Sequence, residues 1–281
     1  MDFFDLHCDT PYECFKNNQE FSKNTLAVSA DKGAVFKRWY QTFAIWIKDD
    51  TENPYTLYKS IIKSFKEKLK SIPDNLHPVF ALEGGSAIEN TDCLFYMKKD
   101  GISFITLSWN GENRIAGGIK SEKGLTDYGK EIIKLMNEQK IGCDLSHLNE
   151  KSFYMALELS DFPLATHSNC KAVCPHPRNL TDRQIKLIAE KGGVIGLCPY
   201  PEFLECSPFE GIYKNILHIL DMGYEDIISI GTDFDGAEMD KKLDSIDKIP
   251  SLYRFLREKG LDNDLLYKIF FKNAHNYIAK L

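Results

Sequence analysis

Short apolar runs recur along the chain and alternate with longer stretches in which apolar residues return at helical spacing. The short runs are rich in β-branched and aromatic residues, as in buried strands. Eight strands are predicted, at Phe3–Asp9, Thr42–Ile47, Pro78–Glu83, Ser103–Ser108, Ile141–Ser146, Pro163–His167, Gly193–Pro199 and Ile227–Asp233. The stretches between them predict helices at Tyr55–Ile72, Ala87–Asp100, Asp127–Gln139, Ser152–Leu159, Thr181–Lys191 and Phe209–Met222.

This alternation indicates an α/β fold with a parallel (β/α)8 barrel, the TIM barrel. A doubly wound open sheet is the competing arrangement, because short apolar runs alone do not separate the two. The chain has 281 residues and no linker or internal repeat, so we expect one catalytic barrel domain over residues 1–281. The longest insertions are expected at Lys16–Arg38, after the first strand, and at Gly111–Leu125, after the fourth.

Composition and charge exclude several classes of partner. The net charge of -6 and the pI near 5.7 argue against a nucleic-acid partner. No basic segment followed by an apolar core begins the chain, and no run approaches the roughly 18 apolar residues of a membrane span. We therefore expect a cytoplasmic protein with no membrane partner. The 8 cysteines are thinly spread and are expected to be reduced thiols.

The predicted strands end in polar residues of one chemical type. In a parallel barrel, the C-terminal ends of the strands carry the chemistry. The first strand also places its two polar residues at alternate positions, so both are expected on one face. Imidazole nitrogens and carboxylate oxygens are ligands for divalent metals, so this set predicts a metal site. Its members are His7, Asp9, Glu83, His147, His167 and Asp233.

Each member of the set also has an ordinary structural interpretation. A single histidine at a strand end is more often structural than a ligand. Asp9 and Asp233 suit turns, and Glu83 suits the start of a helix. If all these interpretations held at once, however, costly polar groups would stand at the ends of several buried strands. The set as a whole therefore favours a site.

The number of ligands exceeds what one tetrahedral site with an open position requires. We therefore expect two metals, with the two oxygens of Glu83 bridging ions about 3.5–4 Å apart. A hydroxide between the ions would be the nucleophile, because metal binding lowers the pKa of water to about 7. Glu83 and Asp233 are thus the expected catalytic residues, with Asp233 taking the proton from that water and passing it on.

Other polar residues fall outside this set. Arg178 follows the sixth strand and offers a planar fork for a carboxylate, or it is a surface arginine paired with Asp182. Tyr200 lies just past the seventh strand and carries a donor hydroxyl. His176 is expected on a loop near the strand ends, where a structural role is the simpler interpretation. The remaining histidines are expected to be structural or exposed, namely His77, His218 and His275.

Six motifs, in this order and approximate spacing, resemble the renal (membrane) dipeptidase family of zinc peptidases, peptidase family M19, a branch of the amidohydrolase-type barrels. The motifs are Asp5-Leu6-His7-Cys8-Asp9-Thr10, Ala81-Leu82-Glu83-Gly84-Gly85, Asp144-Leu145-Ser146-His147, Ala165-Thr166-His167-Ser168-Asn169, Pro177-Arg178-Asn179-Leu180-Thr181-Asp182 and Gly231-Thr232-Asp233-Phe234-Asp235-Gly236. The resemblance implies two zinc ions, one on His7 and Asp9 and the other on His147 and His167, with Glu83 as the bridge. It also implies that Asp233 transfers protons, that Arg178 binds the substrate carboxylate and that Tyr200 assists there.

One position departs from this pattern. Trp109 stands where members of the animal type have a substrate-contacting histidine, and an indole donates one hydrogen bond but does not titrate. Support for the substrate would then come from the metal or from the neighbouring Asn110. The resemblance implies hydrolysis of free dipeptides with tolerance of a C-terminal D-residue, and a possible homodimer. The alternatives are a metal-dependent hydrolase of a phosphoester, lactone or cyclic amide, and a non-catalytic metal- or peptide-binding relative.

Overall fold

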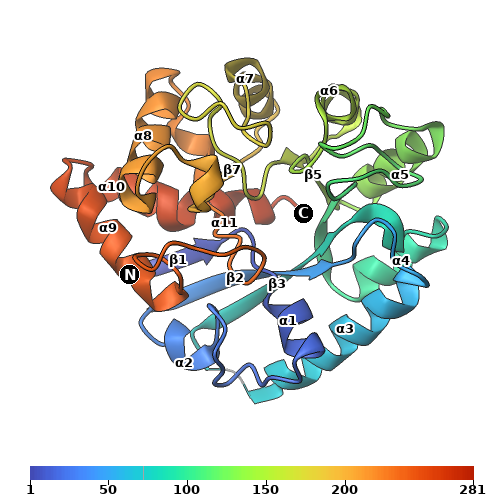
Figure 1. The fold of residues 1–281 in the computed structure, drawn as a ribbon, viewed down its shortest axis with the longest axis horizontal. Helices are drawn as coiled ribbons and strands as arrows, with labels where there is room; N and C mark the ends of the chain where they lie inside the picture. The colour runs from blue at the N-terminus through green and yellow to red at the C-terminus, as the bar shows by residue number, and fades with distance from the viewer. Residues whose placement is uncertain (72) are drawn as a thin grey trace.

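Eight parallel strands form a near-closed barrel in the computed structural model, which describes residues 1–71 and 73–281. The strands follow the order β6-β5-β4-β3-β2-β1-β8-β7 around the sheet. Helices surround the strands on the outside (Figure 1). The strands are β1 (Asp2–Asp5), β2 (Arg38–Trp46), β3 (Leu76–Glu83), β4 (Ile102–Thr106), β5 (Gly142–Asp144), β6 (Pro163–Leu164), β7 (Ile195–Leu197) and β8 (Ile228–Ile230).

The ring closes between β6 and β7 by a thin seam. Here the described residues form one isolated parallel bridge, between Ala165 and Ile195. The Ala165 amide donates to Val194 O at 2.9 Å, and the Gly196 amide donates to Ala165 O at 2.8 Å. A Cβ on Gly196 would come within 1.9 Å of the Thr166 carbonyl oxygen, so a side chain there would force the seam apart. A Cβ on Gly231, which follows β8, would lie 1.7 Å from the same oxygen.

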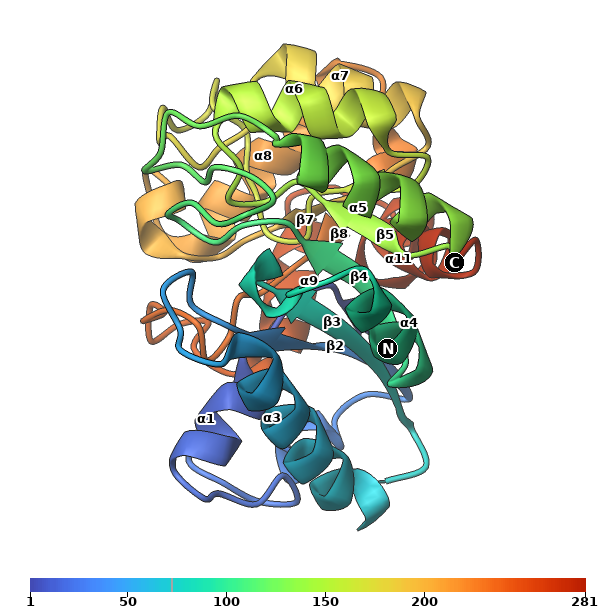
Figure 2. The ribbon, with the colours of Figure 1, turned by 90° about the vertical axis from the view of Figure 1, so that its right-hand side faces the viewer.

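Helices follow most strands, and Figure 2 shows α5 and α6 on one side of the sheet with α1 and α3 on the other. Several helices begin with the N-cap chemistry that their sequences carry: Thr181 accepts the Gln184 amide in a capping box at the start of α7. The helices are α1 (Thr10–Lys16), α2 (Ala30–Gly33), α3 (Pro54–Lys68), α4 (Asp92–Lys99), α5 (Asp127–Glu138), α6 (Glu150–Leu159), α7 (Asp182–Glu190), α8 (Pro208–Asp221), α9 (Ile249–Glu258), α10 (Asn263–Tyr267) and α11 (Asn273–Ile278).

Alternation along the strands divides the core into two clusters. Phe3 packs outward into the large cluster beneath the helices, while Phe4 faces the barrel interior. The interior cluster includes residues from β1, β3, β4 and β6 together with Phe271 and Tyr277 from the C-terminal segment. The Tyr277 hydroxyl donates to Phe162 O at 2.7 Å. The C-terminal segment therefore plugs the end of the barrel where the strands begin, which leaves the other end for a site.

The barrel fold class is confirmed, but several predicted bounds are wrong. Most strands leave the hydrogen-bonded ladder earlier than predicted, so β1 ends at Asp5 and β8 at Ile230. Strand β2 instead begins earlier, at Arg38, inside the predicted insertion. Residues 87–91 are not α-helical, because a 3-10 turn ends at Ala87 and α4 begins only at Asp92. The predicted end of another helix, Ile72, lies outside the described residues.

Two further features bear on earlier expectations. All 8 cysteines are free thiols, and seven of them are buried. No helix within residues 1–71 and 73–281 has both the length and the apolar character that crossing a bilayer demands.

Candidate metal centre

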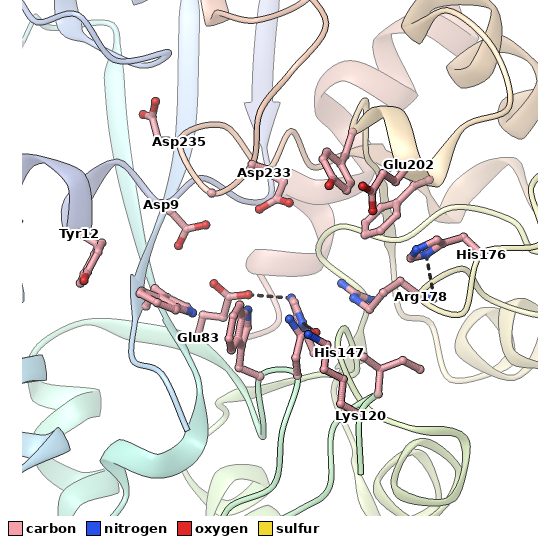
Figure 3. Close-up of a pocket in the computed structure, with 18 of the residues that line it drawn as sticks. Asp9, Tyr12, Glu83, Lys120, His147, His176, Arg178, Glu202, Asp233 and Asp235 are labelled. Carbon is pink, nitrogen blue, oxygen red and sulfur yellow. Dashed lines mark hydrogen bonds and ion pairs between the residues drawn. The ribbon is translucent and has the colours of Figure 1, made fainter. Parts of the chain in front are cut away.

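The polar residues that follow the strands surround one cavity of about 770 Å³ at the C-terminal end of the barrel. Figure 3 shows Asp9 and Tyr12 on one side of it, Arg178 on the other, and Glu83 and His147 facing each other between them. His7 and His167 lie beneath, each 1% exposed. The six residues predicted from five strand ends are therefore neighbours in space.

His7 and Asp9 are close in space, but the backbone conformation that brings them together differs from the predicted extended strand. Both lie beyond β1, and the chain is not extended at Asp9, the N-cap residue before α1, where φ is -98° and ψ is 13°. The pair is held by neighbours instead, because the Asp9 amide donates to Phe234 O at 2.9 Å. His7 Nε2 lies 3.5 Å from Asp9 Oδ2. The predicted extended strand through Asp9 is therefore wrong, because β1 ends at Asp5, although the two side chains do share one site.

Glu83, the last residue of β3, turns its two oxygens to different histidines. Its Oε2 lies 3.4 Å from His7 Nε2. Its Oε1 lies 2.9 Å from His147 Nε2 and 3.8 Å from His167 Nε2. A carboxylate so placed can bind one cation through each oxygen.

The other two histidines point at each other. His147 and His167 follow β5 and β6, and their Nε2 atoms are only 2.8 Å apart. His147 adopts the left-handed backbone region at φ 69°, and its carbonyl accepts the Ile119 amide at 2.8 Å. Its Nδ1 lies 3.0 Å from Asn110 Oδ1. Since an amide oxygen only accepts, the Nδ1 carries the proton and the Nε2 lone pair faces the centre.

A buried threonine serves the remaining histidines. Thr166 Oγ1 lies 3.2 Å from His7 Nδ1 and 2.8 Å from His167 Nδ1. The same oxygen lies 2.7 Å from Asp144 Oδ2. Sequence reasoning missed both Thr166 and Asp144, because buried polar residues inside apolar runs carry no distinct spacing.

Burial and mutual charge shift the titration of the centre. Burial, aided by Arg178, lowers the pKa of His147 to about 4. Burial, together with His7 and His147, lowers the pKa of His167 well below its usual value. Burial also acts to lower the pKa of His7, but Glu83 and Asp9 outweigh it and raise that pKa. Neutral imidazoles are the form that binds metal, and a divalent cation would replace the proton that the carboxylates favour on His7.

These residues fit a divalent metal by a test independent of the motifs. His7 Nε2 and Asp9 Oδ1 are buried, and neither finds a hydrogen-bond partner among the described residues. Two groups of side chains place their ligand atoms within 4.8 Å of one another: His7 with Glu83 and His167, and His7 with Asp9 and Asp233. Buried polar atoms are rarely left without partners, so these atoms indicate a cation. The donor set of nitrogen and oxygen suits zinc and similar metals.

Asp233 stands over the centre from the loop after β8. Its backbone is left-handed at φ 58°, and its amide donates to His7 O at 3.0 Å. Its Oδ1 lies 3.9 Å from His7 Nε2. Burial raises the pKa of this carboxyl to about 7, although His7 acts against the shift. A Cβ on Gly236 would lie 2.2 Å from Asp9 Oδ2, so only glycine lets this loop pass so close.

Arg178 presents a buried positive charge to the cavity. It is 8% exposed, and among the described residues its guanidinium donates to His167 O at 3.3 Å and to Ser168 Oγ at 3.5 Å. Its Nε has no partner, and no ion pair is found for it within the described ranges. Asp182, the alternative partner, instead binds His218 at 2.7 Å. A buried guanidinium without a carboxylate is prepared for an anionic ligand.

Aromatic residues form the rest of the wall. Trp109 contacts Trp46 edge to face, with ring centroids 5.2 Å apart. The Asp49 carboxylate accepts the amides of Trp109 and Gly111 at 3.1 and 2.8 Å, which fixes the loop that carries Asn110. Tyr200 packs edge to face on Phe203 at 4.9 Å. Trp109, Asn110 and Tyr200 all line the cavity, as do two residues that sequence reasoning missed, Tyr12 and Trp46. Trp46 ends β2, but the rule applied to the other strands selects polar residues and therefore does not find it.

A parallel barrel with three imidazoles and three carboxylates at its strand ends is an architecture suited to divalent-metal chemistry. The family described as membrane dipeptidase, peptidase family M19, matches residues 1–279. The chain therefore belongs to the M19 membrane dipeptidase family, and it is a hydrolase of that family.

Individual relatives agree with the family. The chain is 31% identical over 223 residues to an uncharacterized dipeptidase of Schizosaccharomyces pombe, a match over 75% of this chain and 54% of that protein. It is 27% identical over 184 residues to the dipeptidase tcpJ of Claviceps purpurea, over 62% of this chain and 43% of that protein. These matches thus span about half the length of the two relatives.

Solved structures share the fold over the full chain. A dipeptidase of family M19 superposes with a TM-score of 0.89 at 24% identity, covering 100% of this chain and 98% of that one. A metallopeptidase of Rhodobacter sphaeroides, liganded with a phosphinate mimic of the dipeptide L-Ala-D-Ala, gives 0.89 at 23% identity, covering 100% and 99%. An amidohydrolase of Pseudomonas aeruginosa gives 0.80 at 19% identity, covering 99% and 96%.

Proposed function

We propose that this protein is a dizinc dipeptidase that hydrolyses the peptide bond of short, free dipeptides and accepts a D-residue at the C-terminal position. One zinc would be held by His7 and Asp9, the other by His147 and His167, with Glu83 shared between them. The observation that carries the proposal is the division of Glu83, whose oxygens face different histidines at 3.4 and 2.9 Å. One metal alone would leave one of these oxygens without a role.

Arg178 supports a substrate with a free carboxylate. Its guanidinium has no carboxylate partner among the described residues, and Arg178 lines the same cavity as the candidate ligands. A dipeptide that places its carboxylate on Arg178 brings its only peptide bond toward Glu83 and His147, which face each other between Arg178 and Asp9 (Figure 3). The position of Arg178 therefore favours cleavage of the peptide bond next to a free C-terminal carboxylate, and the family description supports dipeptides among such substrates.

The zinc ions, when bound, would polarise the scissile carbonyl and lower the pKa of a water to about 7. Asp233 would hold the proton that this water loses and return it to the leaving amine. Its carboxyl lies 3.9 Å from His7 and faces the cavity, within reach of both positions. Trp109, Asn110 and Tyr200 would confine the substrate between the metal centre and Arg178.

Tolerance of a C-terminal D-residue is supported by the Rhodobacter sphaeroides metallopeptidase, whose structure holds a mimic of L-Ala-D-Ala. A cytoplasmic location belongs to the same proposal, supported by the 8 free thiols. Homodimer formation stays a prediction.

The proposal is tested with zinc-loaded protein and four substrates: L-Ala-L-Ala, L-Ala-D-Ala, and the N-acetylated and C-amidated forms of the first. We expect cleavage of the two free dipeptides and none of the blocked forms. Equal cleavage of the C-amidated form would contradict the carboxylate requirement. If none of the four substrates is cleaved while zinc stays bound, the protein instead catalyses another hydrolytic reaction or has a binding role.

The variant Arg178→Ala tests the clamp within this reaction. We expect kcat/KM to fall by about 30-fold or more, mainly through KM, because losing one partner of a buried charge pair costs about 2–5 kcal/mol. Arg178→Lys retains the charge but not the fork and should recover only part of the loss. Zinc content should stay the same in both variants. Unchanged dipeptide kinetics in Arg178→Ala would remove the clamp from the proposal.

A further inference from the structure

The Thr166 hydroxyl has three polar neighbours but only one proton to donate. Two are imidazole nitrogens, His7 Nδ1 and His167 Nδ1, at 3.2 and 2.8 Å. The third is the carboxylate of Asp144, with Oδ2 at 2.7 Å. A threonine hydroxyl has one proton and two lone pairs, so at most one of these three contacts uses its own proton. Thr166 is fully buried, so bulk solvent does not reach its hydroxyl.

The surroundings of Asp144 decide where that proton goes. Asp144 also receives the Thr106 hydroxyl at 2.7 Å and the amides of Ser146 and Thr166, both at 3.0 Å. Three donors besides Thr166 Oγ1 converge on this carboxyl, so it is the acceptor at each of these contacts. The Thr166 proton therefore belongs to Asp144. The two lone pairs of Thr166 remain, and each accepts an Nδ1–H from one histidine.

The consequence is a fixed tautomer in two residues at once. When Nδ1 of a neutral histidine carries the proton, Nε2 presents a lone pair. His7 Nε2 faces Glu83 Oε2 at 3.4 Å, while His167 Nε2 lies 3.8 Å from Glu83 Oε1. The two histidines thus belong to opposite halves of the centre. His147 is oriented separately, by Asn110.

We propose that Thr166, anchored by Asp144, is a positioning residue that holds one histidine ligand of each metal and so couples the two halves of the centre. The inference rests on the proposed metal centre, but not on the substrate. Outer partners of ligating histidines set ring orientation and ligand basicity, and their loss lowers metal affinity by about 10–100-fold. Because Thr166 contacts both halves, its loss should weaken both sites.

The test compares Thr166→Val with Thr166→Ser. Valine keeps the shape and removes the hydroxyl, whereas serine keeps the hydroxyl. We expect Thr166→Val to lose about 10–100-fold in Zn²⁺ affinity at both sites, measured by competition with a chelator, and Thr166→Ser to stay near the wild type. In zinc-loaded protein labelled with ¹⁵N-histidine, the hydrogen-bonded Nδ1–H signals of His7 and His167 should be lost or shifted in Thr166→Val alone.

The chain offers a matched control in Thr42→Val. Thr42 is a buried threonine of β2 whose hydroxyl finds no partner in the described part of the chain. The same chemical change there tests the general effect of removing a buried hydroxyl, and it should leave Zn²⁺ affinity unchanged. Asn110→Ala supplies a second comparison, because it removes the acceptor of His147 only and should weaken one of the two sites.

The outcomes separate this proposal from the proposed function. Wild-type affinity at both sites in Thr166→Val, or an equal loss in Thr42→Val, would overturn the role of Thr166. If Thr166→Val does not fold, Thr166→Ala removes the same hydroxyl without adding a methyl group and carries the same expectation. A wild type that binds two Zn²⁺ but cleaves no dipeptide would overturn the dipeptidase proposal and leave this one in place.

Discussion

The two ends of the barrel both carry histidines, but they use them differently. At the end where the strands finish, His7, His147 and His167 are buried and turn their Nε2 atoms toward carboxylates or toward each other. At the end where the strands begin, His77 stacks on Tyr40 with centroids 4.5 Å apart. There His275 stacks on Phe271 at 5.1 Å.

The difference teaches that the neighbours of a histidine decide its role. At the end where the strands begin, which we call the lower end, aromatic rings stack on the faces of the imidazoles. This contact does not involve the ring nitrogens. Burial, with Arg38 and His77, lowers the pKa of His275. At the upper end, carboxylates face the nitrogens, and His7 Nε2 is left without a hydrogen-bond partner among the residues described. Only the upper arrangement is incomplete without a cation.

The largest effect should follow from Glu83→Gln. One oxygen becomes an NH2 group, which donates and does not bind a cation, so one half of the centre loses its shared ligand. We expect at least one Zn²⁺ to be lost per chain, and dipeptide turnover to fall about a thousandfold or more, since the pKa of the water then rises toward its value in bulk solvent. Metal analysis and steady-state kinetics measure both. Full zinc content with ordinary turnover would contradict the bridging role.

A smaller effect is expected from Asp233→Asn, which keeps the shape but cannot accept a proton. Turnover should fall by about 100–10,000-fold, the usual contribution of a general base, with two Zn²⁺ retained. Comparing kcat with metal content checks this. A loss of zinc would instead make Asp233 a ligand, a role that its distance of 3.9 Å from His7 also permits. Full activity would exclude it from proton transfer.

The smallest effect is expected at the other end of the barrel, from His77→Ala and His275→Ala. Each removes a stacked ring, so the free energy of unfolding should fall by about 1 kcal/mol per variant, measured by urea denaturation. Zinc content and turnover should match the wild type. A loss of zinc in either variant would contradict the conclusion that histidines at this end do not contribute to metal binding.

Much of the upper end could be predicted from the sequence, because polar residues that end apolar strands must meet at one edge of a parallel barrel. His7, Glu83, His167 and Asp233 follow from that rule alone. The rule does not depend on the exact bounds of the strands, which explains why it works although β6 has only two ladder residues.

The supporting residues could not be predicted in the same way. Thr166 and Asp144 lie within apolar runs, and their role depends on distances between strands. Asp49 and Asn110 come from loops after different strands, and no local pattern links them. The helix α1 was missed although Pro11 follows Asp9 and Thr10, a recognised start signal, because the strand was predicted to extend through Asp9.

The seam between β6 and β7 joins the stability of the barrel to that of the centre. The carbonyl of Thr166 packs against Gly196 and Gly231 at the seam, while its hydroxyl lies against His7 and His167. Local opening of the ring at this place would therefore also separate the histidines. Bound metal would then stabilise the closed barrel against this local opening. Amide hydrogens near Ala165 would therefore exchange with solvent more slowly in the metal-bound protein.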